Sequence, residues 1–172
     1  MKIEELLVNL KIPLDEKHVV WFDAEAFSDV DSYITVFKDL IQISLGKLEF
    51  DSVTIKSGFS DVKNDSNDKP YLIEINLIKN TISDKLKIYC NGWFDLQFLY
   101  DFNSLNQRFF NLAEQFYPLK TNDQSMLIVF VNDFNFDKLD KEGLIENDYS
   151  LYRPKKWDLM DITDIRFLEK IM

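Results

Sequence analysis

The sequence predicts an α+β fold, a single layered domain in which amphipathic helices cover a mainly antiparallel sheet. Three observations support this prediction. Apolar residues recur at helical spacing in separate stretches, alternating apolar segments follow one another without an intervening helix, and residues 126–131 are apolar throughout. Consecutive strands without crossover helices favour an antiparallel meander over a doubly wound sheet. The length of 172 residues suits one domain, spanning residues 1–172.

The first quarter of the chain predicts two helices and a strand. Isoleucines and leucines at helical spacing predict a short helix over residues 2–10, and a compact apolar run predicts a strand over residues 18–22. Ser28 and Asp31 form an S-x-x-D capping box, after which apolar residues recur every three or four positions. These signals predict an amphipathic helix over residues 29–45.

The middle of the chain predicts a three-strand meander. Apolar residues alternate over 48–55, 71–77 and 86–90, which places one side of each strand against the core and leaves the other side in water. The alternation changes phase at residues 51–52, and this slip predicts a β-bulge. The polar stretch 60–70 is the strongest loop signal in the chain.

The last part of the chain predicts a long helix, a buried strand and a final helix. A stripe of phenylalanines and leucines predicts a helix over residues 95–116, ended by Pro118. Residues 126–131 predict a strand that is buried on both faces and is therefore central in the sheet. Residues 133–152 are polar, acidic and irregular, and the apolar spacing within 162–171 predicts a C-terminal helix.

The net charge of the chain restricts the partners that it can bind. Thirty acidic residues oppose twenty basic ones, which gives a formal charge of −10. Such a surface repels nucleic-acid phosphates and anionic lipid heads, whereas it attracts a basic protein and speeds its association. The alternative interpretation is that the charge only maintains solubility. We therefore expect a basic protein partner, no direct contact with nucleic acid and no membrane.

This chain lacks the residues that most familiar catalytic, metal and cofactor sites need. There is one histidine, His18, one cysteine, Cys90, and four isolated glycines, which argues against a triad, a cysteine-based metal site and a phosphate loop. We expect His18 and Cys90 to be packing residues, and we expect no catalytic residue, no metal and no cofactor. The lone cysteine, together with an N-terminus unlike a signal peptide, predicts a cytoplasmic protein.

Two acidic clusters provide the candidate functional residues. The first consists of Asp23, Glu25, Asp29 and Asp31, which fall within nine residues that contain no base. One interpretation is a metal or general-base cluster at the end of the preceding strand. The other interpretation is helix capping beside a solvated loop, which the Ser28–Asp31 pattern favours.

The second cluster interleaves acidic and aromatic side chains in one long segment, which is typical of a protein-binding surface. Its members are Asp133, Phe134, Phe136, Asp137, Asp140, Glu142, Glu146, Asp148 and Tyr149. The alternative is a loop whose aromatic side chains fold back into the core. We expect both clusters to contact a partner.

Three classes of function fit these observations. The sequence favours a non-catalytic, acidic protein-binding domain, for example an inhibitor or immunity protein that neutralises a basic partner such as a nuclease-type bacterial toxin. One alternative is a carboxylate-based enzyme, with or without a divalent metal, that uses the first cluster. The other is an assembly subunit of a phage or secretion system that associates with itself through the aromatic side chains of the second cluster.

Overall fold

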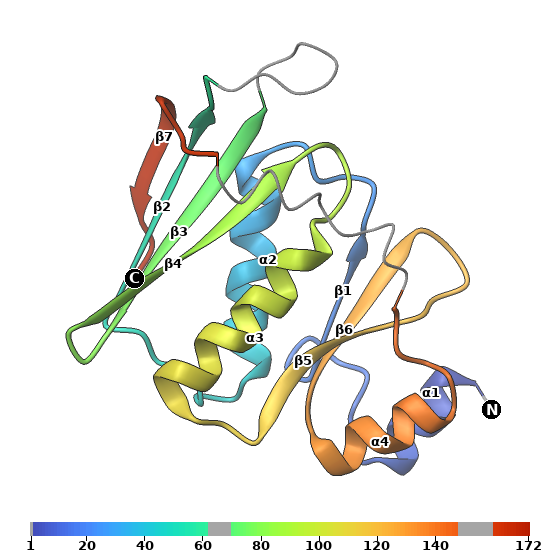
Figure 1. Cartoon of the computed structure of the whole chain (residues 1–172). Coiled ribbons are helices and arrows are strands. Elements are labelled where there is room, and N and C mark those ends of the chain that lie inside the picture. The colour runs from blue at the N-terminus through green and yellow to red at the C-terminus, as the bar shows by residue number, and fades with distance from the viewer. Residues whose placement is uncertain (1, 62–69, 148–159) are drawn as a thin grey trace.

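A computed structural model describes residues 2–61, 70–147 and 160–172 of the chain. Within these residues the chain forms four helices and two antiparallel sheets, which confirms the predicted α+β class (Figure 1). No helix in the described ranges is long and apolar enough to cross a membrane.

The larger sheet contains the predicted meander and one further strand. Its strands lie in the order β4–β3–β2–β7, and each neighbouring pair is antiparallel. The meander consists of β2 (Ser52–Phe59), β3 (Tyr71–Lys79) and β4 (Ile82–Cys90). The fourth strand is β7 (Asp164–Lys170), which pairs with β2 at one edge of the sheet.

The smaller sheet is built around the apolar run that the sequence assigned to a central strand. This run is β6 (Ser125–Asn132), and it lies between β1 (Val19–Asp23) and β5 (Glu114–Leu119). The central position of β6 and the burial of its residues on both faces confirm the prediction. However, β6 belongs to a second sheet rather than to the sheet of the meander, because its backbone pairs with β1 and β5 alone.

Two layers of helices complete the fold. The helices α2 (Val30–Ile43) and α3 (Leu96–Phe110) lie between the two sheets and pack against both (Figure 1). The helices α1 (Ile3–Asn9) and α4 (Asp133–Lys141) cover the other face of the smaller sheet. The result is a layered arrangement of sheet, helices, sheet and helices, with one core on each side of the smaller sheet.

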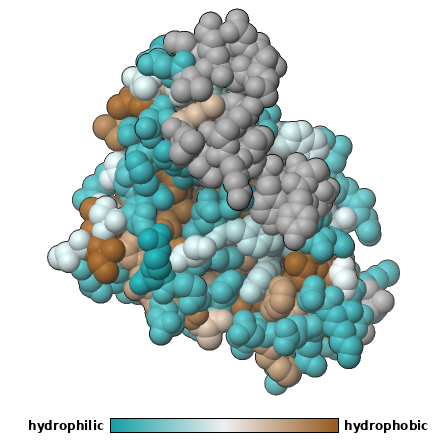
Figure 2. All heavy atoms as spheres, viewed as in Figure 1, coloured by the Kyte–Doolittle hydropathy of each residue, from teal (hydrophilic) through white to brown (hydrophobic). Residues whose placement is uncertain are grey.

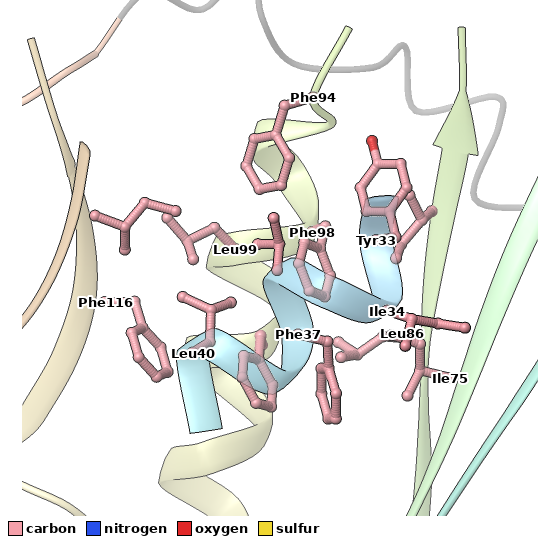
Figure 3. Packing of buried hydrophobic residues seen from close by; sticks show 14 of the residues in the cluster. Tyr33, Ile34, Phe37, Leu40, Ile75, Leu86, Phe94, Phe98, Leu99 and Phe116 are labelled. Atoms are coloured by element: carbon pink, nitrogen blue, oxygen red, sulfur yellow. The ribbon is translucent and has the colours of Figure 1, made fainter. Parts of the chain in front are cut away.

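Aromatic rings dominate the larger core. The rings of Phe98 and Phe102 stack with centroids 6.1 Å apart, and the ring of Phe116 stacks on Phe102 at 5.6 Å. Figure 3 shows Phe98 from α3 and Phe37 from α2 directed into the space between the sheets. All four side chains are fully buried. The aromatic stripe in the sequence therefore forms the core, as its spacing indicates.

The predicted helix over residues 95–116 is too long. Helix α3 ends at Phe110, where Asn111 takes a left-handed conformation with φ 50°, and Phe116 lies in β5. The side chain of Asn103 accepts a hydrogen bond from the Phe116 backbone N–H and donates one to its C=O, both at 2.8 Å. The ring of Phe116 therefore packs against the ring of Phe102 in α3, as the helical spacing predicts, but it reaches this position from the strand β5.

The predicted C-terminal helix is wrong, because residues 164–170 form β7. Seven residues are too few for a stable isolated helix, whereas the open edge of β2 offers backbone partners along its length. Gly58 permits this pairing, since a Cβ at that position would overlap the Asp164 carbonyl. The β2–β7 register shifts between Ser57 and Gly58, so the bulge lies there rather than at residues 51–52.

Two smaller expectations also need correction. Residues 48–50 are not part of a strand, since β2 begins at Ser52 and residues 48–50 lie in the connection before it. Residues 133–141, predicted as irregular, form α4, whose N-terminus is capped by the Asn132 side chain. The cap explains the helix, because Asn132 accepts a hydrogen bond from the Asn135 N–H at 3.0 Å.

Candidate functional site

Three segments that are distant in the sequence meet at one end of the smaller sheet. The Ala24 N–H donates to the Gln124 carbonyl at 3.0 Å, and the Phe94 N–H donates to the Ala24 carbonyl at 2.8 Å. Phe27 and Gly92 exchange a second pair of backbone hydrogen bonds. The end of β1, the connection between β5 and β6, and the segment before α3 are therefore held side by side.

These segments carry a concentration of negative charge that we call the acidic end. It comprises the exposed side chains of Asp23, Glu25, Asp29, Asp31 and Asp123. Residues 21–31, 91–97 and 121–131 contain no lysine, arginine or histidine. All four residues of the first predicted cluster are thus brought together with a fifth carboxylate, Asp123. Carboxylates gathered from segments that carry no base of their own attract a partner of the opposite sign.

Local hydrogen bonds orient several of these carboxylates. Asp23 accepts from the Glu25 N–H at 2.9 Å, and Asp29 accepts from the Ser32 N–H at 2.8 Å. Asp29 is therefore the N-cap of α2, and the predicted capping box with Ser28 as the cap is wrong by one residue. The hydroxyl and backbone N–H of Ser125 donate to Asp123 and hold the pKa of that carboxyl below its ordinary value.

Two tryptophans lie exposed at the same end of the sheet. The side chain of Trp21 is 55% exposed, and that of Trp93 is 45% exposed. Trp21 borders a hollow of about 520 Å³, whose walls also include Leu127 and the acidic-end residue Asp123. Lys2 and Lys120 reach this hollow from outside the three acidic segments. An exposed indole beside a hollow is the kind of side chain that anchors a protein partner.

The second predicted cluster begins at the opposite end of the smaller sheet. Asp23 pairs with Ser125 at the start of β6, whereas Asp133 follows Asn132 at its end. Eight residues of extended strand separate Asp23 from Asp133 by roughly 25 Å. Figure 1 shows α4 at the lower end of the sheet, away from the connection between β5 and β6. The structure therefore separates Asp133 from the acidic end, whereas the segment after α4 returns towards that end, where Leu144 borders the same hollow as Trp21 and Asp123.

The residues of the second cluster differ in their surroundings. The Phe136 ring packs on the Tyr117 ring with centroids 4.4 Å apart, so this aromatic residue folds back onto the smaller core. Phe134 is 67% exposed, and the Lys138 ammonium lies 4.9 Å from the centre of its ring. The acidic members of this cluster on and just after α4 are exposed, namely Asp133, Asp137, Asp140 and Glu142.

The remaining members lie beyond α4. The backbone N–H of Glu146 donates to the Pro118 carbonyl at 2.8 Å, which fixes this segment against β5. Asp148 and Tyr149 lie outside the described residues.

The two scarce reactive side chains, Cys90 and His18, lie in different surroundings. Burial, with further contributions from Asp95 and Asp29, raises the pKa of the Cys90 thiol to about 12, so the thiolate is a negligible species near pH 7. The Nδ1 atom of His18 lies 2.6 Å from Asp15 Oδ1 at the surface. Across residues 2–61, 70–147 and 160–172, no three side chains of His, Cys, Asp or Glu gather closely enough to form a metal site.

Sequence reasoning missed Trp21, Trp93 and Asp123. Trp21 lies in an apolar run that the sequence assigns to a strand, and strand alternation places its side chain opposite to those of Val20 and Phe22. Alternation could therefore have identified Trp21 as facing a different side. No local signal connects Trp93 and Asp123 with residues 21–31, because backbone pairing between distant segments creates this neighbourhood.

Comparisons with known proteins identify no relative of this chain. The chain matches no protein-family model, no curated protein sequence and no solved structure. The geometry of the acidic end is therefore the basis on which a function can be argued.

Proposed function

We propose that this chain is a non-catalytic protein-binding domain that uses the acidic end to bind and neutralise a basic protein. The observation that carries the proposal is the joining of five exposed carboxylates and two exposed tryptophans from three segments without a base. Charge complementarity accelerates the encounter with a basic surface. A tryptophan that becomes buried in the interface with the partner slows dissociation of the complex. Both contributions are needed for a tight inhibitor.

The chemistry of the surface indicates the class of partner. A protein that binds nucleic acid carries clustered lysines and arginines, and an acidic domain that covers this cluster blocks it. We therefore propose an inhibitor of the immunity type, which masks the basic cleft of a toxin such as a nuclease. The lone cysteine suits a reducing compartment, so we place this activity in the cytoplasm.

A capture experiment with two matched charge reversals tests the proposal. The first variant, Glu25→Lys with Asp31→Lys, alters the acidic end, and the second, Asp137→Lys with Asp140→Lys, alters α4. Both raise the net charge equally, and all four positions are exposed. Wild-type chain and both variants are immobilised and exposed to extracts of cells that make the chain. Captured proteins are identified and their binding is then measured with purified components.

The proposal expects a basic protein that binds the wild-type chain and the α4 variant but not the acidic-end variant. Poly-L-lysine serves as a probe of non-specific charge attraction, and it should respond similarly to both variants. A captured partner that is acidic, or that binds the acidic-end variant as well as the wild-type chain, would show that this surface is not the interface.

A further inference from the structure

The outer edge of β7 has no backbone partner among the residues that the structure describes. On its other side β7 pairs with β2, but it is the last strand of the four-stranded sheet. The outer edge of β5 shows how the fold closes an edge elsewhere. There the Lys120 N–H donates to the Leu144 carbonyl at 2.7 Å, and the Glu146 N–H donates to the Pro118 carbonyl at 2.8 Å. An open edge is a template for pairing with another strand.

The side chains of β7 are also unusually exposed for a strand. Six of its seven residues are exposed, and they include Ile165 at 53% and Leu168 at 65%. Figure 2 shows strongly hydrophobic residues at the surface in the region of β7, at the upper left of the view. Apolar side chains on an unpaired edge favour association, because their burial removes apolar area from water.

The charges of β7 indicate which partner fits. Asp164 and Glu169 balance Arg166 and Lys170, so the strand is neutral although the whole chain carries −10. Two acidic copies repel each other, but charges beyond about 10 Å are largely screened at moderate salt. A neutral strand is therefore a place where two copies can approach. A basic partner is favoured by the acidic end and gains nothing from a neutral edge.

We propose that β7 pairs in antiparallel fashion with β7 of a second copy, which joins two four-stranded sheets into one. The strand begins with Asp164 and ends with Lys170. An antiparallel pair centred on Phe167 brings Asp164 of each copy to Lys170 of the other. A parallel pair would place like charges opposite each other. The Asp164–Arg166 contact within one copy, at 2.7 Å, lies at the exposed surface and costs little to exchange.

The backbone of β7 is positioned for this pairing. The Ile171 N–H donates to the Val53 carbonyl of β2 at 2.9 Å. Because successive N–H groups of a strand point to opposite sides, the N–H groups of Leu168 and Lys170 point away from β2. These groups and their carbonyls are available to the second copy.

Sedimentation velocity of the full chain over about 5 to 500 µM tests the proposal. The wild-type chain is expected to form a dimer, and Leu168→Lys is expected to weaken it at least about tenfold by placing a charge opposite Arg166 of the second copy. Val8→Lys is the matched control, since Val8 is also 65% exposed and gains the same charge. The proposal is overturned if the wild-type chain stays monomeric across this range. It is also overturned if Leu168→Lys and Val8→Lys weaken the dimer equally.

A charge exchange provides a second test that does not depend on Leu168. Asp164→Lys alone and Lys170→Asp alone each place like charges opposite each other and are expected to weaken the dimer. The double variant restores opposite charges and should recover it. Circular dichroism and thermal unfolding confirm that each variant keeps the fold of the wild-type chain. Failure of the double variant to recover the dimer overturns the antiparallel pairing. The test is independent of the proposed binding of a basic protein.

Discussion

The two acidic regions at opposite ends of the smaller sheet have similar composition but different electrostatic surroundings. The acidic end contains five exposed carboxylates on segments without a base. On α4, by contrast, Lys138 and Lys141 alternate with Asp137 and Asp140, and pairs spaced by three or four residues lie on the same side of a helix. The comparison shows that an acidic count alone does not identify a binding surface, because neighbouring bases cancel its field.

The aromatic residues of the two regions differ in the same sense. Trp21 is exposed beside a hollow and has no lysine or arginine within cation–π distance among the described residues. Phe134 is more exposed than Trp21, but the Lys138 ammonium lies over its ring, and Phe136 packs on Tyr117. The acidic end therefore presents exposed tryptophan side chains on segments without a base, whereas the phenylalanine rings of α4 contact Lys138 and Tyr117.

The largest difference is expected in the rate of association with the basic partner. Glu25→Lys with Asp31→Lys should slow association about a hundredfold at low salt, because electrostatic steering depends on the local field. Asp137→Lys with Asp140→Lys should slow it less than about threefold. Stopped-flow measurements at several salt concentrations give both rates. If the α4 variant lost as much as the acidic-end variant, total charge rather than its location would govern binding.

The next difference concerns the two exposed aromatic side chains. Trp21→Ala should weaken binding about tenfold to a hundredfold, mainly through faster dissociation, as for a buried interface anchor. Phe134→Ala should change binding less than about threefold. Surface plasmon resonance measures the dissociation rates, and thermal unfolding checks that both variants fold. Equal effects of the two substitutions would contradict the asymmetry between the regions.

A smaller effect concerns the titration of Asp123. Since Ser125 lowers the pKa of this carboxyl through hydrogen bonds to its charged form, the acidic end keeps that charge to a lower pH than an ordinary aspartate would. Ser125→Ala removes the hydroxyl donor and should raise the pKa of Asp123 towards that of an ordinary aspartate. Carboxyl NMR resonances followed against pH measure the change. An unaltered titration would show that the Ser125 hydroxyl is not the cause of the lowered pKa of Asp123.

The smallest expected effect is on stability. Carboxylates that lack local bases repel one another, so Glu25→Gln should stabilise the fold, by no more than about 0.5 kcal/mol. Asp137→Asn should give no gain, because Lys141 lies four residues later on α4 and offsets the charge of Asp137. Urea unfolding of the two variants at low salt provides the comparison. A gain from Asp137→Asn equal to that from Glu25→Gln would mean that the bases on α4 do not compensate its acids.

Much of the fold could be predicted from local patterns. Period-2 alternation identified the meander, and helical spacing identified α1, α2 and the start of α3. The errors fall where one pattern fits two structures. Phe116 satisfies the helical stripe, yet it reaches the same core from β5, and the spacing of Ile165 and Leu168 suits a helix, although both lie in a strand.

The candidate site shows the same limit. Asp23, Glu25, Asp29 and Asp31 could be identified as a group because they are close in sequence, and their exposure follows from their charge. Asp123 joins them only because β6 pairs with β1 in a register that sets Asp23 against Ser125. The length of the same strand separates Asp133, at the start of the second predicted cluster, from the first cluster.

The sequence by itself determined the α+β class, the aromatic core, the excess of negative charge and the scarcity of reactive side chains, since these depend on composition and on patterns a few residues long. Only the tertiary structure decided the division into two sheets, the pairing of β7 with β2 and the assembly of the acidic end. Those features depend on backbone hydrogen bonds between distant segments. Such bonds use the same N–H and C=O groups at every residue, so no side-chain pattern records which segments they join.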